Sequence, residues 1–244
     1  MKSDLPEPGP GAGTPPRVCA AIPAYNSGAT VARVVLGTRK HVACVLVIDD
    51  GSTDATAALA ERAGACVVRL GTNRGKGRAL RAAFDCALEG GYDALVTLDA
   101  DLQHEPAELP RLVDCFSARG SNLVVGDRLH CSGRIPGVRY ATNRVGTFCF
   151  SRLTGLRIPD SQSGYRLYDR RIMEEVPIRY DGFEAESDLL LRAGARGFRI
   201  DFVPVRAIYF HGPLHQSHFR PFRDTTRICL VFLRNLLWKP SGIA

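Results

Sequence analysis

The sequence predicts an α/β fold in a single domain, with a parallel sheet covered by helices. Three observations support this fold class. The 244 residues, of which 45% are hydrophobic, suffice for one substantial core. Short apolar runs alternate with stretches of helical periodicity, as in strands joined by crossover helices. Clusters of polar residues directly follow the strands, at the sheet edge where such folds bind ligands.

Each element is expected from its local pattern. Five apolar runs bounded by turn residues are expected to be strands, at 18–22, 44–49, 66–70, 94–99 and 122–126. Helical periodicity covers four segments between them, near 28–39, 53–63, 76–89 and 106–118. Farther along, an acidic turn at 183–188 opens an apolar helix that ends in glycine before a strand at 198–205.

The two ends of the chain differ from this pattern. Residues 1–16 contain five prolines and three glycines and almost no bulky apolar side chains, so we expect a disordered tail. The folded domain is expected to span 17–220. Residues 221–239 are expected to form an amphipathic helix, because arginines and a lysine punctuate and flank an apolar run. Such a helix suits a membrane surface, and packing on the core would produce a similar pattern.

The charge and the cysteines restrict the partners and the compartment. A net charge of +7 suits phosphate-rich ligands or an anionic membrane surface, and no nucleic-acid module is apparent. The eight cysteines never approach CxxC spacing, so we expect buried thiols in a reducing compartment instead of disulfides or a zinc site. There is no signal pattern and no run of about 18 apolar residues. We therefore expect a cytoplasmic protein that is at most peripheral on the cytosolic face of a membrane.

Four polar clusters should meet at the carboxyl edge of the sheet, at 23–26, 49–54, 73–77 and 99–104. Glycine and hydroxyl residues in the second cluster suit a turn and a helix cap. The adjacent carboxylates Asp49 and Asp50 are not explained in that way. Like charges repel unless one of them meets a donor, such as a base or a ribose hydroxyl.

The fourth cluster has the chemistry of a metal site. Asp99 and Asp101 stand two residues apart after an apolar strand, and Gln103 adds another oxygen. Oxygen ligands suit Mg²⁺ or Mn²⁺, which bridge a diphosphate and stabilise it as a leaving group. The run 71–77 lacks the spacing of a P-loop, and His104-Glu105 does not match HExxH, so neither kinase nor zinc-protease chemistry is expected.

In their order and spacing, the motifs IPAYN, VIDDGSTD, NRGKGRAL and LDADLQH resemble the family 2 glycosyltransferases. The resemblance implies the GT-A (Rossmann-like) fold, in which a mixed and mainly parallel sheet is flanked by helices. The resemblance is closest to the dolichyl- or polyprenyl-phosphate sugar synthases, such as dolichol-phosphate mannosyltransferase. It implies an inverting, metal-dependent transfer of a sugar from a GDP- or UDP-sugar to dolichyl or undecaprenyl phosphate. Two other functions stay open, namely the same donor chemistry with a soluble glycan or metabolite acceptor, and a non-catalytic subunit that binds nucleotide sugars.

The resemblance also implies a donor site. Pro23, Tyr25 and Asn26 would line the nucleotide pocket, where the family often has Glu in place of Asn26, and Asp50 would contact the base or ribose. The nucleotide and its ion would be held by Asp99, Ala100 and Asp101, with Gln103 as a further ligand. Lys76 would neutralise phosphate or orient the sugar, although a solvated loop lysine fits the pattern nearly as well.

The acceptor side is implied by later residues. In relatives, arginines at the positions of Arg128 and Arg139 face the acceptor phosphate, and guanidinium forks suit a phosphomonoester. Taken alone, this arginine-rich stretch also fits a solvated loop. A further family stretch, DSQSGYRLY, would shape the pocket beside the sugar through Asp160, Ser163 and Gly164.

Two more positions complete the implied site. Glu186 matches a carboxylate near the acceptor and would be catalytic or orient the sugar, although acidic residues in a first helical turn also simply favour the helix dipole. An acceptor phosphate is already ionised at neutral pH, so direct attack needs no strong general base. Relatives commonly carry a lysine over the diphosphate, and His218 is expected to replace it here.

Overall fold

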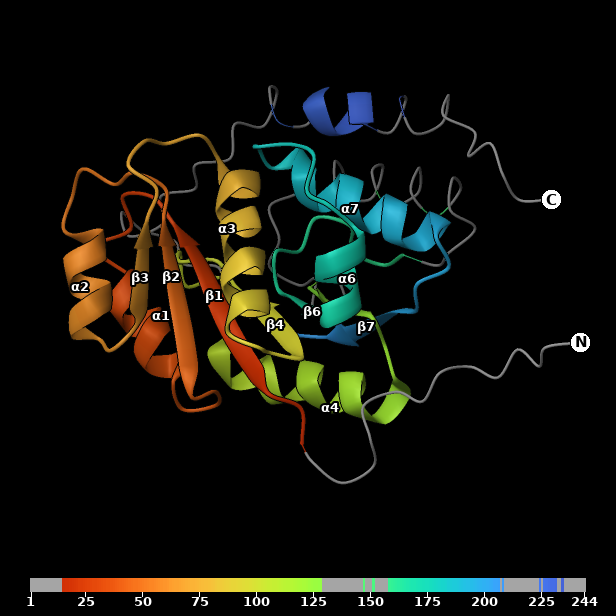
Figure 1. Ribbon diagram of the computed structural model, residues 1–244, viewed down its shortest axis with the longest axis horizontal. Coiled ribbons are helices and arrows are strands. Elements are labelled where there is room, and N and C mark those ends of the chain that lie inside the picture. The colour runs from red at the N-terminus through yellow and green to blue at the C-terminus, as the bar shows by residue number, and fades with distance from the viewer. Residues whose placement is uncertain are drawn as a thin grey trace, which may run out of the picture.

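The computed structural model describes residues 15–128, 147, 151, 158–206, 208, 224, 226–231 and 234. Within these residues, one seven-stranded sheet has the order β3-β2-β1-β4-β6-β5-β7 (Figure 1). Only β6 pairs antiparallel with its two neighbours, so the other strands all run in the same direction. The prediction of a mixed and mainly parallel sheet is confirmed.

The observed elements follow the predicted alternation closely. The strands are β1 (Val18–Ala24), β2 (Cys44–Asp49), β3 (Cys66–Arg69), β4 (Ala94–Thr97), β5 (Leu123–Asp127), β6 (Arg166–Asp169) and β7 (Ile200–Pro204). The helices are α1 (Val31–Thr38), α2 (Thr56–Arg62), α3 (Lys76–Glu89), α4 (Leu109–Arg119), α6 (Arg170–Glu175) and α7 (Glu184–Ala195), with a 3-10 turn at Pro106–Glu108. The sequence pattern predicted neither β6 nor α6.

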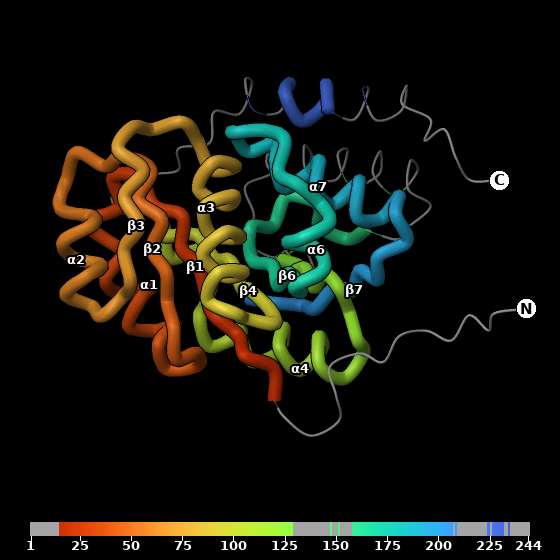
Figure 2. The backbone as a smooth tube through the Cα atoms, in the orientation of Figure 1, coloured from red at the N-terminus to blue at the C-terminus, as the bar shows by residue number. Residues whose placement is uncertain are grey.

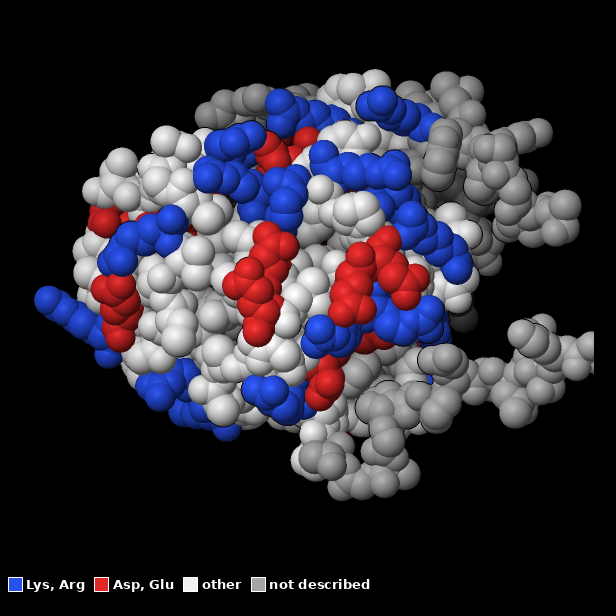
Figure 3. Space-filling view, in the orientation of Figure 1, with Lys and Arg blue, Asp and Glu red and all other residues white. Residues whose placement is uncertain are grey.

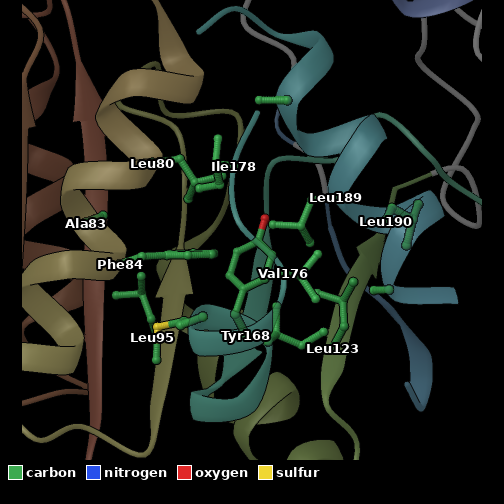
Figure 4. Close-up of a cluster of buried hydrophobic side chains, with 14 of the residues drawn as sticks. Leu80, Ala83, Phe84, Leu95, Leu123, Tyr168, Val176, Ile178, Leu189 and Leu190 are labelled. Atoms are coloured by element: carbon green, nitrogen blue, oxygen red, sulfur yellow. The ribbon is translucent and has the colours of Figure 1, made fainter. Parts of the chain in front are cut away.

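The sheet separates two apolar cores because successive side chains of a strand point to opposite faces. On β1, Cys19 and Ala21 face a core with α3, α6 and α7, whereas Ala20 and Ile22 face a core with α1, α2 and α4. Figure 4 shows part of the first core, where side chains of α3 and α7 surround the ring of Tyr168 on β6. The rings of Phe84 and Tyr168 meet edge to face with centroids 5.0 Å apart. These contacts join α3 and the inserted strand β6 into one unit.

The described part of the C-terminal segment packs on the protein. Residues 226–231 are helical and lie near α7 (Figure 2). Ile228 and Val231 are buried in the core that contains α7. Leu230 is 58% exposed, and a guanidinium nitrogen of Arg227 lies 4.0 Å from Glu184 Oε1 at the start of α7. Core packing therefore accounts for the apolar face of these residues. No helix of the described residues is long and apolar enough to cross a membrane.

The cysteines meet the expectation only in part. Cys19 lies in the core, where burial raises the pKa of its thiol to about 12. Cys66 and Cys229 are exposed, contrary to the expectation of burial, because Cys66 begins an edge strand and Cys229 lies on the outer face of the C-terminal helix. The expected disordered tail lies outside the described residues, apart from positions 15 and 16.

Candidate active site

The predicted polar clusters converge at one edge of the sheet. β1, β2 and β4 are adjacent and parallel, so the residues that follow them emerge side by side. α3 begins at the same edge with Lys76, and the first turn of α7 brings Glu186 there. Figure 3 shows Lys and Arg side chains gathered over the neighbouring surface of α3 and α7. This edge is the place where open α/β sheets bind ligands.

The first two clusters are joined by hydrogen bonds. The backbone N–H of Asn26 donates to Ser52 Oγ at 2.9 Å, and its Oδ1 accepts from the N–H of Thr53 at 2.8 Å. Asn26 has a φ of 46°, in the left-handed region that Asn tolerates better than most residues. Pro23 and Tyr25 precede this turn and are half-buried. These residues lie together as predicted, and their contact with a nucleotide remains a prediction.

Backbone donors satisfy both adjacent carboxylates of the second cluster. Asp49 Oδ1 accepts from the N–H of Ser52 at 2.9 Å. Asp50 Oδ2 accepts from the N–H groups of Arg74 at 3.1 Å and Gly75 at 2.6 Å. Burial raises the pKa of Asp50, and these N–H bonds oppose that rise. The carboxylate pair therefore does not by itself require a ligand. Asp50 fixes the loop that leads into α3, and its contact with a base or ribose remains a prediction.

The fourth cluster is a closed turn that begins at Asp99, two residues after the end of β4. Asp101 Oδ1 accepts from the N–H of Gln103 at 3.0 Å, and Leu102 adopts a φ of 65°. The N–H of Asp99 donates to Nδ1 of His104 at 3.0 Å, which closes the turn on itself. The strand ends at Thr97, two residues earlier than predicted, because the chain leaves the ladder to form this turn.

Lys76 connects the fourth cluster to α7. Its Nζ lies 2.6 Å from Asp99 Oδ1 and 3.0 Å from Glu186 Oε2, and its side chain is 11% exposed. Burial opposes ionisation of Asp99, but the Lys76 ammonium holds the pKa of that carboxyl well below its usual range. Burial likewise lowers the pKa of Lys76, and the two carboxylates more than reverse the effect. Lys76 is therefore part of the site and not a solvated loop residue.

Gly164 supplies the space for this ion pair. A Cβ at this position would lie 2.9 Å from Asp99 Oδ2 and closer still to Lys76 Nζ. We expect Gly164→Ala to lower donor affinity by about tenfold, since displacing either group weakens a buried ion pair. Calorimetric titration with nucleotide and Mn²⁺ measures this effect. Gly120→Ala, which has open space around the new methyl but a positive φ, controls for general strain; equal losses in both variants would contradict the prediction.

The residues predicted for the acceptor side take part in two arginine networks. Arg128 binds Asp160 in a fork, with its Nε 2.8 Å from Oδ2, and the Asp160 side chain is fully buried. Arg166 is fully buried on β6, and its guanidinium donates to three carbonyls, those of Ser161, Ser163 and Glu186. The loop with Asp160, Ser163 and Gly164 is thus fastened to α7. Arg139 and His218 lie outside the described residues.

Two residues of this region, His104 and Arg166, were not predicted as site residues from the sequence. His104 was considered only as part of a zinc motif, and its position directly after Asp-Leu-Gln was the available signal. Its side chain is fully buried and stacks on the Tyr165 ring with centroids 5.1 Å apart. Burial lowers the pKa of His104 to about 4, so the ring is neutral at physiological pH. Arg166 gave no signal, because a single arginine in a four-residue strand resembles an exposed position.

The donor set fits a hard divalent cation that also binds a diphosphate. Among the described residues, no group of three or more His, Cys, Asp or Glu could hold a metal ion. Asp99, Asp101 and Gln103 nevertheless offer oxygen ligands, and Mg²⁺ is commonly held by one or two carboxylates together with substrate phosphates. Asp99, Asp101 and Glu186 with Lys76 carry three negative charges and one positive charge. The excess of two negative charges matches a divalent cation.

Comparison with known proteins adds independent information. A family model described as Glycosyl transferase family 2 matches residues 19–177. Glycosyltransferase AglJ of Haloferax volcanii is 34% identical over 91% of this chain and 72% of its own length. Polyprenol monophosphomannose synthase of Mycolicibacterium smegmatis is 34% identical over 78% of this chain and 76% of its own. Undecaprenyl-phosphate mannosyltransferase of Micrococcus luteus is 33% identical over 78% of this chain and 82% of its own.

Solved structures share the architecture. Glucosyl-3-phosphoglycerate synthase from Mycobacterium tuberculosis, in complex with Mn²⁺, UDP-glucose and phosphoglyceric acid, has a TM-score of 0.74 at 23% identity. The match covers 93% of this chain and 82% of that chain. The same enzyme with Mg²⁺ and UDP has a TM-score of 0.68 at 22% identity. These likenesses confirm the predicted GT-A fold.

Proposed function

Because the chain belongs to glycosyl transferase family 2, and is thus a glycosyltransferase, we propose that it moves a sugar from a nucleoside diphosphate to a polyprenyl phosphate. The observation that carries this proposal is the network of Lys76 with Asp99 and Glu186 beside Asp101. It gathers the charges needed for a sugar diphosphate and its ion at the ligand-binding edge of the sheet. The GDP- or UDP-sugar would bind over the carboxyl ends of β1, β2 and β4.

The chain's own residues have distinct parts in the proposed reaction. Asp99, Asp101 and Gln103 would hold Mg²⁺ or Mn²⁺, which would neutralise the diphosphate as it leaves. Lys76 would lie beside the same phosphates, and Glu186 would accept a hydrogen bond from a sugar hydroxyl. The ionised acceptor phosphate would attack the anomeric carbon from the face opposite the diphosphate. Inversion follows from that direction of attack, and no general base is required.

The acceptor is proposed from the relatives and from the arginines. Two of the similar proteins are named for polyprenol or undecaprenyl phosphate substrates. Arg128, which is fixed by Asp160, would lie on the acceptor side, and Arg139 would join it to bind a phosphomonoester. The lipid acceptor would bring the protein to the cytosolic face of a membrane as a peripheral protein. His218 would cover the diphosphate.

Arginine variants test the acceptor. We expect Arg128→Lys and Arg139→Ala to lose about 100-fold in transfer to undecaprenyl and dolichyl phosphates, while the slow hydrolysis of the donor persists. Lysine at position 128 keeps a charge for buried Asp160 but not the two-pronged fork. Radiolabelled UDP- and GDP-sugars measure both reactions. Arg171→Ala, which removes an exposed ion pair with Glu175, is the control.

The alternatives predict different results. Turnover with a soluble glycan or metabolite, and none with lipid phosphates, would contradict the proposed acceptor. Mn²⁺-dependent nucleotide binding without turnover on any acceptor would contradict catalysis of this reaction.

A further inference from the structure

We propose that His104 is a positioning residue, whose Nδ1 holds the backbone of Asp99 so that the carboxylates of Asp99 and Asp101 present one preformed site to the ion and diphosphate. This inference rests on the proposed function. His104 itself would touch neither substrate nor ion. It would act through the shape of the turn at 99–104.

The contact is specific in its direction. The N–H of Asp99 can only donate, so Nδ1 must accept at their separation of 3.0 Å, and the ring proton resides on Nε2. Asp99 is the first residue after Leu98, whose own N–H still bonds to Ala21 of β1. His104 therefore fixes the backbone at the point where the chain leaves the sheet. Without this acceptor, the N–H of Asp99 would turn to find another partner.

The other end of the turn is held separately. The N–H of Gln103 bonds to Asp101 Oδ1, and its carbonyl accepts from the N–H of Ile208 at 2.9 Å. Leu102 completes the turn in a left-handed conformation that is unfavourable for leucine by itself. A turn that contains such a residue needs anchors at both ends. The hydrogen bond from the N–H of Asp99 to His104 is the anchor nearest to the carboxylate of Asp99.

A purely structural role explains His104 less well. Its side chain is fully buried and stacked on Tyr165, and its Nε2 has no hydrogen-bond partner among the described residues. A buried polar atom without a partner is costly, and an apolar residue of similar size would fill the space without that cost. The imidazole is therefore best explained by the one bond that its Nδ1 does make. That bond is to a residue of the proposed metal site.

Two amide variants separate this role from packing. In His104→Asn, the amide oxygen can take the place of Nδ1 and accept from Asp99. In His104→Gln, the longer side chain places its amide near the position of Nε2 instead. Both variants are polar and similar in size, so a difference between them reports the acceptor position. Leu112→Ala, which opens a cavity on α4 in the core that Tyr165 shares, controls for lost stability alone.

The readouts are thermal unfolding and calorimetric titration of UDP or GDP in the presence of Mn²⁺. We expect the Gln variant to lose about 10–100-fold in Mn²⁺-dependent affinity, the range typical of residues that orient metal ligands, and the Asn variant to stay within about threefold. Leu112→Ala should unfold at a lower temperature with unchanged affinity. If the Gln variant does not fold, His104→Leu takes its place, with the same expected loss.

The outcomes divide clearly. Equal affinity in wild type and the Gln variant, or equal losses in the Gln and Asn variants, would overturn the role of His104. A wild-type chain that binds neither nucleotide with Mn²⁺ would contradict the proposed function and this inference with it.

Discussion

Asp101→Ala is expected to reduce sugar transfer by about 10²–10³-fold, the loss typical when one preorganised charge at a reacting centre is removed. Asp101 is half-exposed on the closed turn, and its removal also takes away the acceptor for the N–H of Gln103. Removing this side chain leaves only one of the two carboxylates proposed for the ion. It also halves the excess negative charge of the site. Radiolabelled transfer to polyprenyl phosphate, measured across a Mn²⁺ titration, gives the effect.

Asp101→Asn refines this experiment. The amide oxygen still accepts from the N–H of Gln103, as Oδ1 does at 3.0 Å in the wild type, but the charge is lost. We expect the Asn variant to be nearly as inactive as the Ala variant and as stable as wild type. Transfer at the wild-type rate in Asp101→Ala would refute the proposed mechanism as a whole.

Lys76→Met is expected to lower both activity and stability. It leaves the carboxylates of Asp99 and Glu186 without the cation between them, and Glu186 is 8% exposed in its side chain. Removing one partner of a buried ion pair costs 3–5 kcal/mol, and the 30% exposure of the Asp99 side chain places this case at about 3 kcal/mol. Urea denaturation at pH 7 measures the loss.

The pH dependence of this variant has a definite sign. Without Lys76, the two neighbouring carboxylates repel, so the folded state binds a proton more readily than the unfolded state does. Its stability deficit should therefore shrink as the pH falls from about 7 to 5. Lys40→Met, the same change at an exposed position, should have little effect at either pH. A deficit that stays constant over this range would contradict the assigned ion pairs.

Much of the fold was predictable because its determinants are local. The alternation of apolar runs with helical periodicity identified β1 to β5 and the helices between them, since period and turn residues are properties of short segments. The polar clusters after those strands converge as expected, because parallel neighbouring strands end at the same edge. The spacing of Asp99 and Asp101 is also a local property, which the sequence shows directly.

The strand β6 was not predictable in this way. Its four residues, Arg166–Asp169, include two charged side chains and show no helpful period. They form a strand because β4 and β5 offer unpaired edges on either side, and this pairing brings Arg166 under the first turn of α7. Only contacts between distant segments decide such an element.

The same division applies to the site. The sequence by itself determined the α/β architecture, the edge at which the polar residues gather and the oxygen-bearing side chains that follow β4. The tertiary structure decided that Lys76 lies between Asp99 and Glu186, that backbone donors satisfy Asp50, and that His104 turns back onto Asp99. Side-chain type and spacing are local properties, whereas the partner of a buried charge depends on which distant segments pack against it.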